Sequence, residues 1–404
     1  MIPDRVGTVP GGESRSDASP ARSSLSRRPP GDLNARTGML IRKMSAVFAP
    51  SRVGSLWQQR MQAVREYEVV RDGNVFGAGF SHSFVYSSEY AEARRYLATL
   101  LSRYRGMTIG EQFRGKEIVN EGGTCFSLES RQNLFPPAFD LDRFRTDLLK
   151  DLALVHGIGP ATRKRLVARG YQTIPDLLAH PLLRSPAQQV LACLSEGDTA
   201  ALMDLIGSRH AKSHPSVLGT AMLHEPEDFV FVDIETLGLF SRPIILFGVG
   251  VIDHGQLVVR QFLLRDIAEE QAALNATVEP LVRDRSVLVT FNGKAFDLPY
   301  IADRLAYYGM APPTRIPHFD VLHFSRRRWK DQFPSLRLAV LEQKILGVCR
   351  NDDIPGQMVP DFYETYQRTG NIGPLVPIVE HNRQDVVSLA QLFFYLLGES
   401  YGRQ

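Results

Sequence analysis

Phe229-Val-Phe-Val-Asp-Ile-Glu-Thr-Leu-Gly238 is the most informative stretch of this 404-residue chain. Its first four residues are apolar or aromatic, which is typical of a buried strand. Side chains alternate across a strand, so Asp233 and Glu235 point to the same side of it. Two carboxylates on a buried strand are costly unless a positive charge compensates them, and such hard oxygen ligands suit Mg²⁺ or Mn²⁺. The alternative is that one carboxylate is exposed and the other pairs with a lysine or arginine.

Two further acidic positions favour the metal interpretation. Residues 286–297 read as a strand that runs into a turn at Asn292-Gly293 and delivers Asp297 to the start of an apolar helix over 298–308. Residues 379–390 read as a helix, on which His381 and Asp385 lie four positions apart and therefore on one face. Taken singly, each has a simpler explanation. Asp297 is also a suitable helix N-cap, and the second pair also suits a solvated helix surface.

Together these motifs resemble those of the DnaQ-like (DEDD) exonucleases in the ribonuclease H-like superfamily. The order and context agree: Asp-x-Glu on a first strand, Asn-x-x-x-Phe-Asp after a later strand, and a terminal helix whose motif ends in Asp. Within that superfamily the chain resembles the YprB-type ribonuclease H-like proteins over roughly residues 225–400. The features shared with that type are Glu380-His-Asn382, Asp385-Val386, Leu346-Gly-Val348, Asp353-Ile-Pro-Gly356 and Tyr366-x-x-x-Gly370.

The resemblance implies a site of four catalytic carboxylates, Asp233, Glu235, Asp297 and Asp385, that hold two Mg²⁺ or Mn²⁺ ions. In such a site one ion activates the attacking water and the other stabilises the leaving 3′ oxygen. His381 would orient or deprotonate the water, because imidazole titrates near neutral pH. It stands four residues before Asp385, where the related enzymes place tyrosine; those that use histidine place it five residues before. The role of His381 is therefore open.

Several residues near the third carboxylate have two interpretations. Asn292 and Phe296 either position the terminal nucleotide or only build the turn. Asp320, on a short predicted strand, is either a fifth acid near the site or a structural partner. The run Ser325-Arg-Arg-Arg-Trp-Lys330 either clamps a nucleic-acid strand through phosphate contacts and base stacking, or is solvated.

The amino-acid composition excludes few classes of protein. With 44% hydrophobic residues the chain can bury a substantial core, and its length suggests two or three domains. The net charge of +3 neither demands nor excludes nucleic acid as a partner. The three cysteines, Cys125, Cys193 and Cys349, have no zinc-site or disulfide spacing, which favours a reducing cytoplasm. The sequence has no apolar run long enough for a transmembrane helix, so no membrane partner is expected.

The segments before residue 146 contain no candidate catalytic residues. Residues 1–50 are rich in Pro, Gly, Ser and Arg and are predicted to be a disordered tail; alternatively, translation begins at Met39 or Met44. Residues 51–145 are predicted to form a small α+β segment of unknown role. It contains a helix over 90–104 and two alternating strands at 116–120 and 123–129.

Residues 146–215 are predicted to be a helical region that binds nucleic acid. An apolar helix runs into Gly157-Ile-Gly159, and a second helix begins at Pro160, a favoured first helical position. The free N–H groups of that helix, with Arg163 and Lys164 in its first turns, are suited to a phosphate. The segment resembles a helix-hairpin-helix module, which holds the polynucleotide backbone without reading sequence. The alternative is a helical hairpin used only for packing or protein contacts.

The remaining pattern fixes the fold class. Residues 244–252, 256–263, 286–291 and 318–321 read as further strands, and 269–282 as a helix. Strands that first form a meander and then alternate with helices predict a mixed sheet flanked by helices. The predicted fold is therefore α/β, with a ribonuclease H-like domain over 225–400.

The function indicated by these motifs is metal-dependent hydrolysis of phosphodiester bonds in DNA or RNA, as a 3′–5′ exonuclease. Two other classes stay open: a non-catalytic nucleic-acid-binding protein that uses the nuclease fold as a scaffold, and a protein-interaction adaptor. Convergence of the four acids favours the enzyme, whereas a dispersed site, or one filled by a cationic side chain, favours the scaffold.

Overall fold

The computed structural model describes residues 67–68, 85–238, 242–350 and 354–403. The expected tail over 1–50, and the two alternative start positions within it, lie outside the described residues. From Glu66 to the C-terminus the chain forms one compact unit. Within the described part of the chain, no helix is both long and apolar enough to cross a bilayer.

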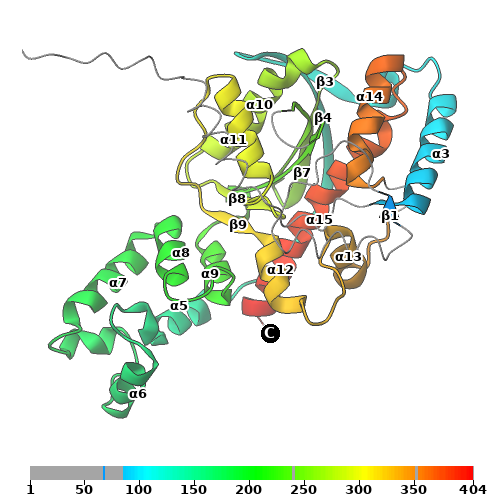
Figure 1. Ribbon diagram of the computed structural model, residues 1–404. Helices are drawn as coiled ribbons and strands as arrows, with labels where there is room; N and C mark the ends of the chain where they lie inside the picture. Colours follow the sequence, from blue (N-terminus) through cyan, green and yellow to red (C-terminus); the bar gives the residue numbers. More distant parts are fainter. Residues whose placement is uncertain (1–66, 69–84, 239–241, 351–353, 404) are drawn as a thin grey trace, which may run out of the picture. The chain divides into compact units, whose positions relative to one another are not determined.

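A seven-stranded mixed sheet organises this unit (Figure 1). Its strand order is β3-β4-β7-β6-β5-β8-β9. The strands are β3 (Gly115–Asn120), β4 (Gly123–Asn133), β5 (Phe229–Thr236), β6 (Ile244–Asp253), β7 (Gln256–Leu263), β8 (Val287–Thr290) and β9 (His318–Asp320). Strands β5, β6 and β7 form the antiparallel meander, and β8 and β9 run parallel to β5. The predicted mixed sheet is thus present.

The strands predicted in the small N-terminal segment belong to this same sheet. β4 pairs antiparallel with β7 from Phe126↔Leu263 to Asn133↔Gln256, and β3 pairs with β4 at the edge. The sequence indicated the two strands but placed them in a unit of their own. In the structure they extend the sheet of the nuclease-like domain. A separate two-residue pairing joins β1 (Tyr67–Glu68) to β2 (Val85–Tyr86).

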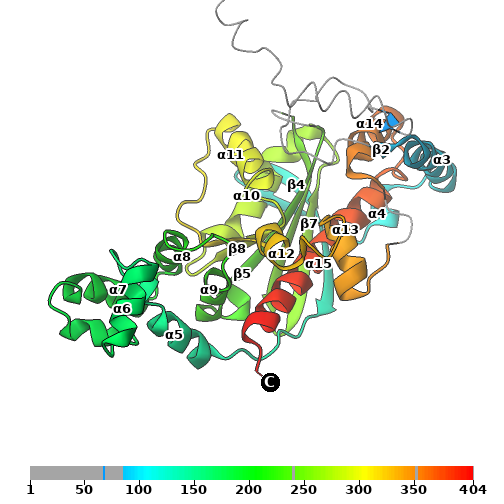
Figure 2. The ribbon, with the colours of Figure 1, turned by 60° about the horizontal axis from the view of Figure 1, so that its bottom comes forward.

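Helices cover both faces of the sheet, and the alternation along β5 shows which residues meet them (Figure 2). Val230, Val232 and Ile234 pack in one cluster with residues of α10 (Glu270–Val278) and α11 (Asp297–Tyr307). Phe229 and Phe231 point to the other face and pack in a cluster with α15 (Leu375–Tyr401). Asp233 and Glu235 lie on the same face of β5 as Phe229 and Phe231, so they face α15.

The remaining helices complete the nuclease-like part. They are α3 (Ser87–Arg103), α4 (Ile109–Gln112), α12 (Val321–Trp329), α13 (Leu338–Leu341) and α14 (Val359–Thr369). A π-helical turn over Glu342–Leu346 follows α13, and short 3₁₀ turns lie at 267–269, 279–282 and 356–358. The predicted helix over 269–282 therefore ends earlier, at Val278, because Pro280 supports a 3₁₀ turn there.

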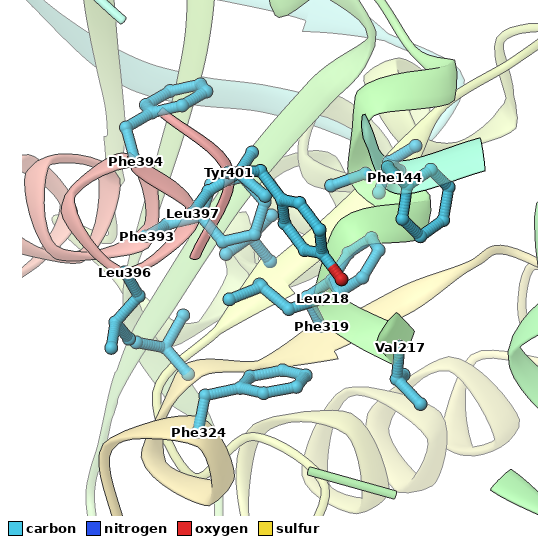
Figure 3. Packing of buried hydrophobic residues seen from close by; sticks show 14 of the residues in the cluster. Phe144, Val217, Leu218, Phe319, Phe324, Phe393, Phe394, Leu396, Leu397 and Tyr401 are labelled. Atoms are coloured by element: carbon cyan, nitrogen blue, oxygen red, sulfur yellow. The ribbon is translucent and has the colours of Figure 1, made fainter. Parts of the chain in front are cut away.

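The predicted helical region contains α5 (Leu141–Lys150), α6 (Pro160–Ala168), α7 (Arg184–Glu196), α8 (Thr199–Gly207) and α9 (Pro215–Gly219). It shares a hydrophobic core with the end of α15 (Figure 3). The Phe144 ring of α5 meets the edge of Tyr401 at 5.4 Å between centroids. A Cβ at Gly219 would lie 2.6 Å from the Phe144 ring, so only glycine lets α9 approach this pair.

Candidate active site

Asp233 is held by a row of side chains that crosses three strands. In the sheet register Asp233 lies opposite Gly248, and Gly248 lies opposite Gln261. Asn382 of α15 lies above Gly248 and bridges the two outer residues. Its Nδ2 donates to Asp233 Oδ2 at 2.8 Å, and its Oδ1 accepts from Gln261 Nε2 at 2.9 Å. A Cβ on Gly248 would meet this amide and the Val386 side chain. The glycine therefore lets α15 come close to the acidic end of β5.

Asp297 is brought to the same place by the turn that the sequence predicted. It is the first residue of α11 and is buried, and the backbone N–H of Ile234 donates to its carboxylate. That amide lies between Asp233 and Glu235 on β5. The carboxylate of α11 is thus attached to the strand that carries the other two acids.

Asp320 fixes the turn, and its negative charge, in addition to burial, raises the pKa of Asp297. Its Oδ1 accepts from the N–H of Asn292 at 2.9 Å, and its Oδ2 accepts from the N–H of Lys294 at 3.1 Å. Asn292 has a positive φ of 66°, which a non-glycine residue adopts only when the surrounding structure supports it. Asp320 therefore has a structural role in the turn, and its effect on Asp297 places it near the acidic site as well.

His381 and Asp385 reach the acids from α15, as their spacing on one helical face predicted. The His381 Nε2 lies 3.6 Å from Asp385 Oδ2 and 3.9 Å from Glu235 Oε1. Both side chains are largely buried, with 14% and 16% of their surfaces exposed. The imidazole therefore lies between carboxylates that come from the sheet and from the helix.

Arg350 is the cationic residue of this site, and the sequence gave no sign of it. Its Nε and Nη2 donate to the two oxygens of Glu342, each at 2.6 Å. Nη2 also pairs with Asp385 Oδ1, and Nη1 lies 3.2 Å from His381 Nδ1. A guanidinium can only donate, so Nδ1 accepts, and the neutral imidazole then carries its proton on Nε2.

The acids interact strongly through their charges. Burial, followed by the negative charges of Asp385, Glu235 and Asp297, raises the pKa of Asp233 well above its usual range. Burial likewise raises the pKa of Asp297 to about 7, although the backbone N–H groups that donate to it act in the opposite direction. Carboxylates from three separate elements are therefore close enough to oppose one another's ionisation.

This donor set has the chemistry that Mg²⁺ or Mn²⁺ requires. All four candidate ligands supply carboxylate oxygens, which hard divalent ions prefer, and the repulsion among them is the condition that such an ion relieves. Within the residues that the structure describes, however, no three His, Cys, Asp or Glu side chains stand ready to hold one ion. Two of the four carboxylates are instead paired, Asp385 with Arg350 and Asp233 with Asn382.

A cleft of about 720 Å³ opens beside these residues. His381, Asp385 and Asn292 line it, so the site is accessible to a ligand. Glu92 and Tyr96 of α3 also line it, so the N-terminal segment contributes to this cleft, which its sequence did not indicate.

Two aromatic candidates for nucleotide contact pack against other aromatic side chains, Phe296 half-buried and Trp329 buried. Phe296 packs against Tyr300 at 5.5 Å between ring centroids, which supports the turn-building role. Trp329, in the basic run at the end of α12, is 2% exposed and packs against Phe333 and Tyr395. Of the two interpretations of this run, base stacking on the tryptophan is excluded, because the ring is buried in the core beside α15.

The hairpin candidates lie at the start of α6. Gly159 is its N-cap and Pro160 its first residue, as expected. Gly157 has a φ of +86°, a conformation that glycine adopts without strain. Arg163 and Lys164 are exposed, and a Cβ built at either glycine would meet no described atom within 4 Å. The backbone of this turn is thus open to a ligand.

Comparison with known proteins agrees with this architecture. Residues 230–397 match the model of the RNase_H superfamily. These residues form an RNase_H superfamily domain. The uncharacterized protein YprB of Bacillus subtilis (strain 168) is 31% identical over 179 residues. That match spans 43% of this chain and 43% of YprB, so the chain matches less than half the length of this curated relative.

A solved structure also matches part of the chain. The family B DNA polymerase from the hyperthermophilic archaeon Pyrobaculum calidifontis is matched at 18% identity with a TM-score of 0.32. The match covers 41% of this chain and 24% of the polymerase. The ribonuclease H-like fold predicted from the acidic motifs is confirmed for the RNase_H superfamily domain by the family match and the mixed sheet.

Proposed function

We propose that the chain is a divalent-metal-dependent phosphodiester hydrolase, specifically a 3′–5′ exonuclease that acts on DNA or RNA. The observation that carries this proposal is the mutual electrostatic effect of Asp233, Glu235, Asp297 and Asp385, which come from β5, α11 and α15. If these residues served only stability, apolar side chains in their places would make the protein more stable, because buried like charges oppose folding.

The four carboxylates would be the ligands of two Mg²⁺ or Mn²⁺ ions. When bound, the ions would supply a nucleophile at neutral pH and charge stabilisation for the leaving group. Asn382 fixes the rotamer of Asp233 through the 2.8 Å hydrogen bond, and the Ile234 amide fixes Asp297. These two contacts orient the ligands before a substrate arrives, which reduces the reorganisation that the reaction requires.

His381 is the proposed base. Its Nε2 faces Glu235 and Asp385, two of the proposed metal ligands. While Arg350 donates to Nδ1, the neutral ring keeps its proton on Nε2 and cannot accept another there. The base role therefore requires Arg350 to leave Nδ1, so that the tautomer can change.

The hairpin before α6 is the proposed site for the polynucleotide backbone. Its exposed glycine turn and the free N–H groups of the first turn of α6 suit a phosphate, and Arg163 and Lys164 add positive charge. Such contacts bind without base recognition, as a nuclease without sequence preference requires.

One observation favours a second function. Arg350 already neutralises Asp385, and a carboxylate that is permanently paired in this way cannot ligate an ion. In that case the RNase_H superfamily domain would be a scaffold for nucleic-acid binding without hydrolysis.

Hydrolysis of end-labelled single-stranded DNA and RNA separates the two functions. Wild type should shorten the substrates stepwise from the 3′ end with Mn²⁺ and not with EDTA. Asp233→Asn keeps the volume and removes one ligand charge, so its activity should be lost while its circular dichroism spectrum is unchanged. Glu227→Gln, an exposed carboxylate just before β5, is the matched control and should stay active. Binding without Mn²⁺-dependent cleavage in wild type would support the scaffold.

A further inference from the structure

Two further clefts follow the cleft of about 720 Å³ beside the acidic residues, which we name the active-site cleft. The first, which we name the lysine cleft, has a volume of about 250 Å³ and is lined by Lys212 and Lys294. The second, which we name the arginine cleft, has a volume of about 600 Å³ and is lined by Arg143 and Arg327. Phe324 of α12 lines both, so the lysine and arginine clefts are adjacent.

Helix α12 and the turn after β8 connect these two clefts with the active-site cleft. On α12, Leu322 lines the active-site cleft, His323 the lysine cleft and Arg327 the arginine cleft. In the turn, Asn292 lines the active-site cleft and Lys294 the lysine cleft. An α-helix rises by about 1.5 Å per residue, so Leu322 and Arg327 lie about 8 Å apart along the axis of α12. A strand of a few nucleotides is therefore long enough to reach from the active-site cleft to the arginine cleft.

Cations without an ionic partner outnumber such acids in the lysine and arginine clefts. Asp151 pairs with His210 at 2.5 Å, and Glu399 pairs with Arg328 at 2.8 Å. Asp320 is buried and accepts from backbone N–H groups. The other Lys, Arg, Asp and Glu side chains that line these clefts are exposed and form no ion pair with any residue that the structure describes: Arg143, Lys212, Lys294, Arg327, Asp147 and Asp204. The two clefts together therefore have an excess of positive charge.

The lysine cleft brings together two distant parts of the chain. Lys212 follows α8 of the helical region, and Lys294 lies in the turn between β8 and α11. The surrounding protein partly desolvates Lys294 and thereby lowers its pKa; the positive charge of Lys212 acts in the same direction, and the negative charge of Asp320 in the opposite one. Two cations that oppose each other's ionisation are a favourable place for an anion, which would relieve their repulsion.

We propose that the lysine cleft and the arginine cleft bind phosphates of the polynucleotide strand whose end enters the active-site cleft. The proposal rests on the hydrolase function proposed above and identifies where its substrate continues. Phosphate oxygens accept from lysine and arginine N–H groups, and the hydroxyls of Ser213 and Ser216 in the arginine cleft are further donors. Contacts of this kind carry no sequence information, as a nuclease without sequence preference requires.

The basic run at 325–330 contains a matched control. Arg327 lines the arginine cleft, whereas the exposed Arg326 and Lys330 line none of the three clefts. Three double variants each remove two exposed positive charges: Arg143→Gln/Arg327→Gln in the arginine cleft, Lys212→Gln/Lys294→Gln in the lysine cleft, and the control Arg326→Gln/Lys330→Gln. Circular dichroism confirms the fold of each. Fluorescence anisotropy in EDTA, at several salt concentrations, gives their affinity for a labelled oligothymidylate of about 20 nucleotides.

Each cleft variant should bind the oligonucleotide at least about fivefold more weakly than wild type. The slope of log affinity against log salt concentration should become shallower by about 1.4, because each contact between a cation and a single-strand phosphate contributes about 0.7. The control should bind within about twofold of wild type and with the same slope, since its charges lie outside the clefts and are screened by salt.

Three outcomes would overturn the proposal. A control that loses as much affinity as the cleft variants would show that the attraction is general and not located in the clefts. An unchanged salt slope in the cleft variants would show that no phosphate contact was lost. Polyglutamate that displaces the oligonucleotide at an equal concentration of negative charges would show that the clefts bind an acidic protein segment instead.

Binding in EDTA is independent of hydrolysis, so the two proposed roles fail separately. Unchanged binding by the cleft variants, together with Mn²⁺-dependent cleavage by wild type, would contradict only the role of the clefts. The expected losses of affinity, in a protein that cleaves no substrate, would support the role of the clefts and contradict only the hydrolase function.

Discussion

The close approach of α15 to the sheet at Gly248 allows a quantitative test of how the site is assembled. In Gly248→Ala the new Cβ would lie 2.8 Å from both Asn382 Nδ2 and Val386 Cγ2. Real side chains do not approach so closely, so the helix must shift or Asn382 must leave Asp233. Overpacking of this kind reduces the free energy of unfolding by about 1–3 kcal/mol.

Asn382→Ala perturbs the same contact from the other side. It removes one hydrogen bond to a carboxylate and one from the buried Gln261, so we expect a loss of about 2–4 kcal/mol. It also removes the amide that the methyl group introduced by Gly248→Ala would meet. In the double variant Gly248→Ala/Asn382→Ala, the new Cβ would be too close to Val386 alone. Its free energy of unfolding should therefore be higher, by about 0.5–2 kcal/mol, than the value obtained by adding the two single losses.

Urea unfolding of the four proteins gives this coupling energy directly. Gln384→Ala is a suitable control, because this half-buried residue of α15 makes one neutral side-chain hydrogen bond, to Ser388. Its loss should stay below about 1 kcal/mol. If the losses of Gly248→Ala and Asn382→Ala are additive, the two residues do not interact energetically. That result would refute the claim that their contact determines how closely α15 packs on the sheet.

Three further predictions concern single sites. In EDTA, burial raises the pKa of Asp297 from its usual 3.8 to about 7, so its contribution to stability is present below pH 4 and is lost as pH rises to 7. Urea unfolding at each pH should show that the free energy of unfolding of Asp297→Asn rises by about 2–3 kcal/mol relative to that of wild type between pH 5 and pH 8. A difference between the two proteins that does not change with pH would contradict this. His381→Ala should lower the hydrolysis rate roughly 10²–10⁴-fold and remove the acidic limb of the pH–rate profile, whereas a near-native rate would exclude it as the base. A Cβ at position 159 would meet no described atom within 4 Å and the backbone φ there is ordinary, so Gly159→Val should keep the fold. Its affinity for a long oligonucleotide should fall more than its affinity for a very short one. Equal losses would indicate that the hairpin serves only in packing of the fold.

Much of the nuclease-like fold could be predicted because its strands are local apolar runs. The strand at 256–263 was predicted with the bounds that the structure gives it. The helix predicted over 379–390 extends from Leu375 to Tyr401 and is buried along most of its length, with Glu380, Tyr395 and Glu399 exposed. The pairing of β4 with β7 could not be predicted, because strands so far apart in sequence carry no local sign of their partner.

The acidic residues of the site were also predictable, and their cationic and amide partners were not. Asp233, Glu235, Asp297 and Asp385 stand in motifs whose spacing identifies them. Arg350 meets Glu342 only because a π-helical turn ends between them, and no simple periodicity encodes that contact. Asn382 stands beside His381 in a recognisable motif, yet its role depends on Gly248 and Gln261 of two other strands. The signal available in advance was a pair of glycines at alternate positions of β6, which indicates close approach by another element.

The central claim is that the four carboxylates hold divalent ions, and anomalous scattering from crystals soaked in Mn²⁺ with a non-hydrolysable oligonucleotide tests it most directly. The account predicts anomalous peaks among Asp233, Glu235, Asp297 and Asp385, with Asp385 no longer paired with Arg350. Saturating Mn²⁺ that leaves no peak there, with Arg350 still on Asp385, would contradict it and would support the scaffold function instead.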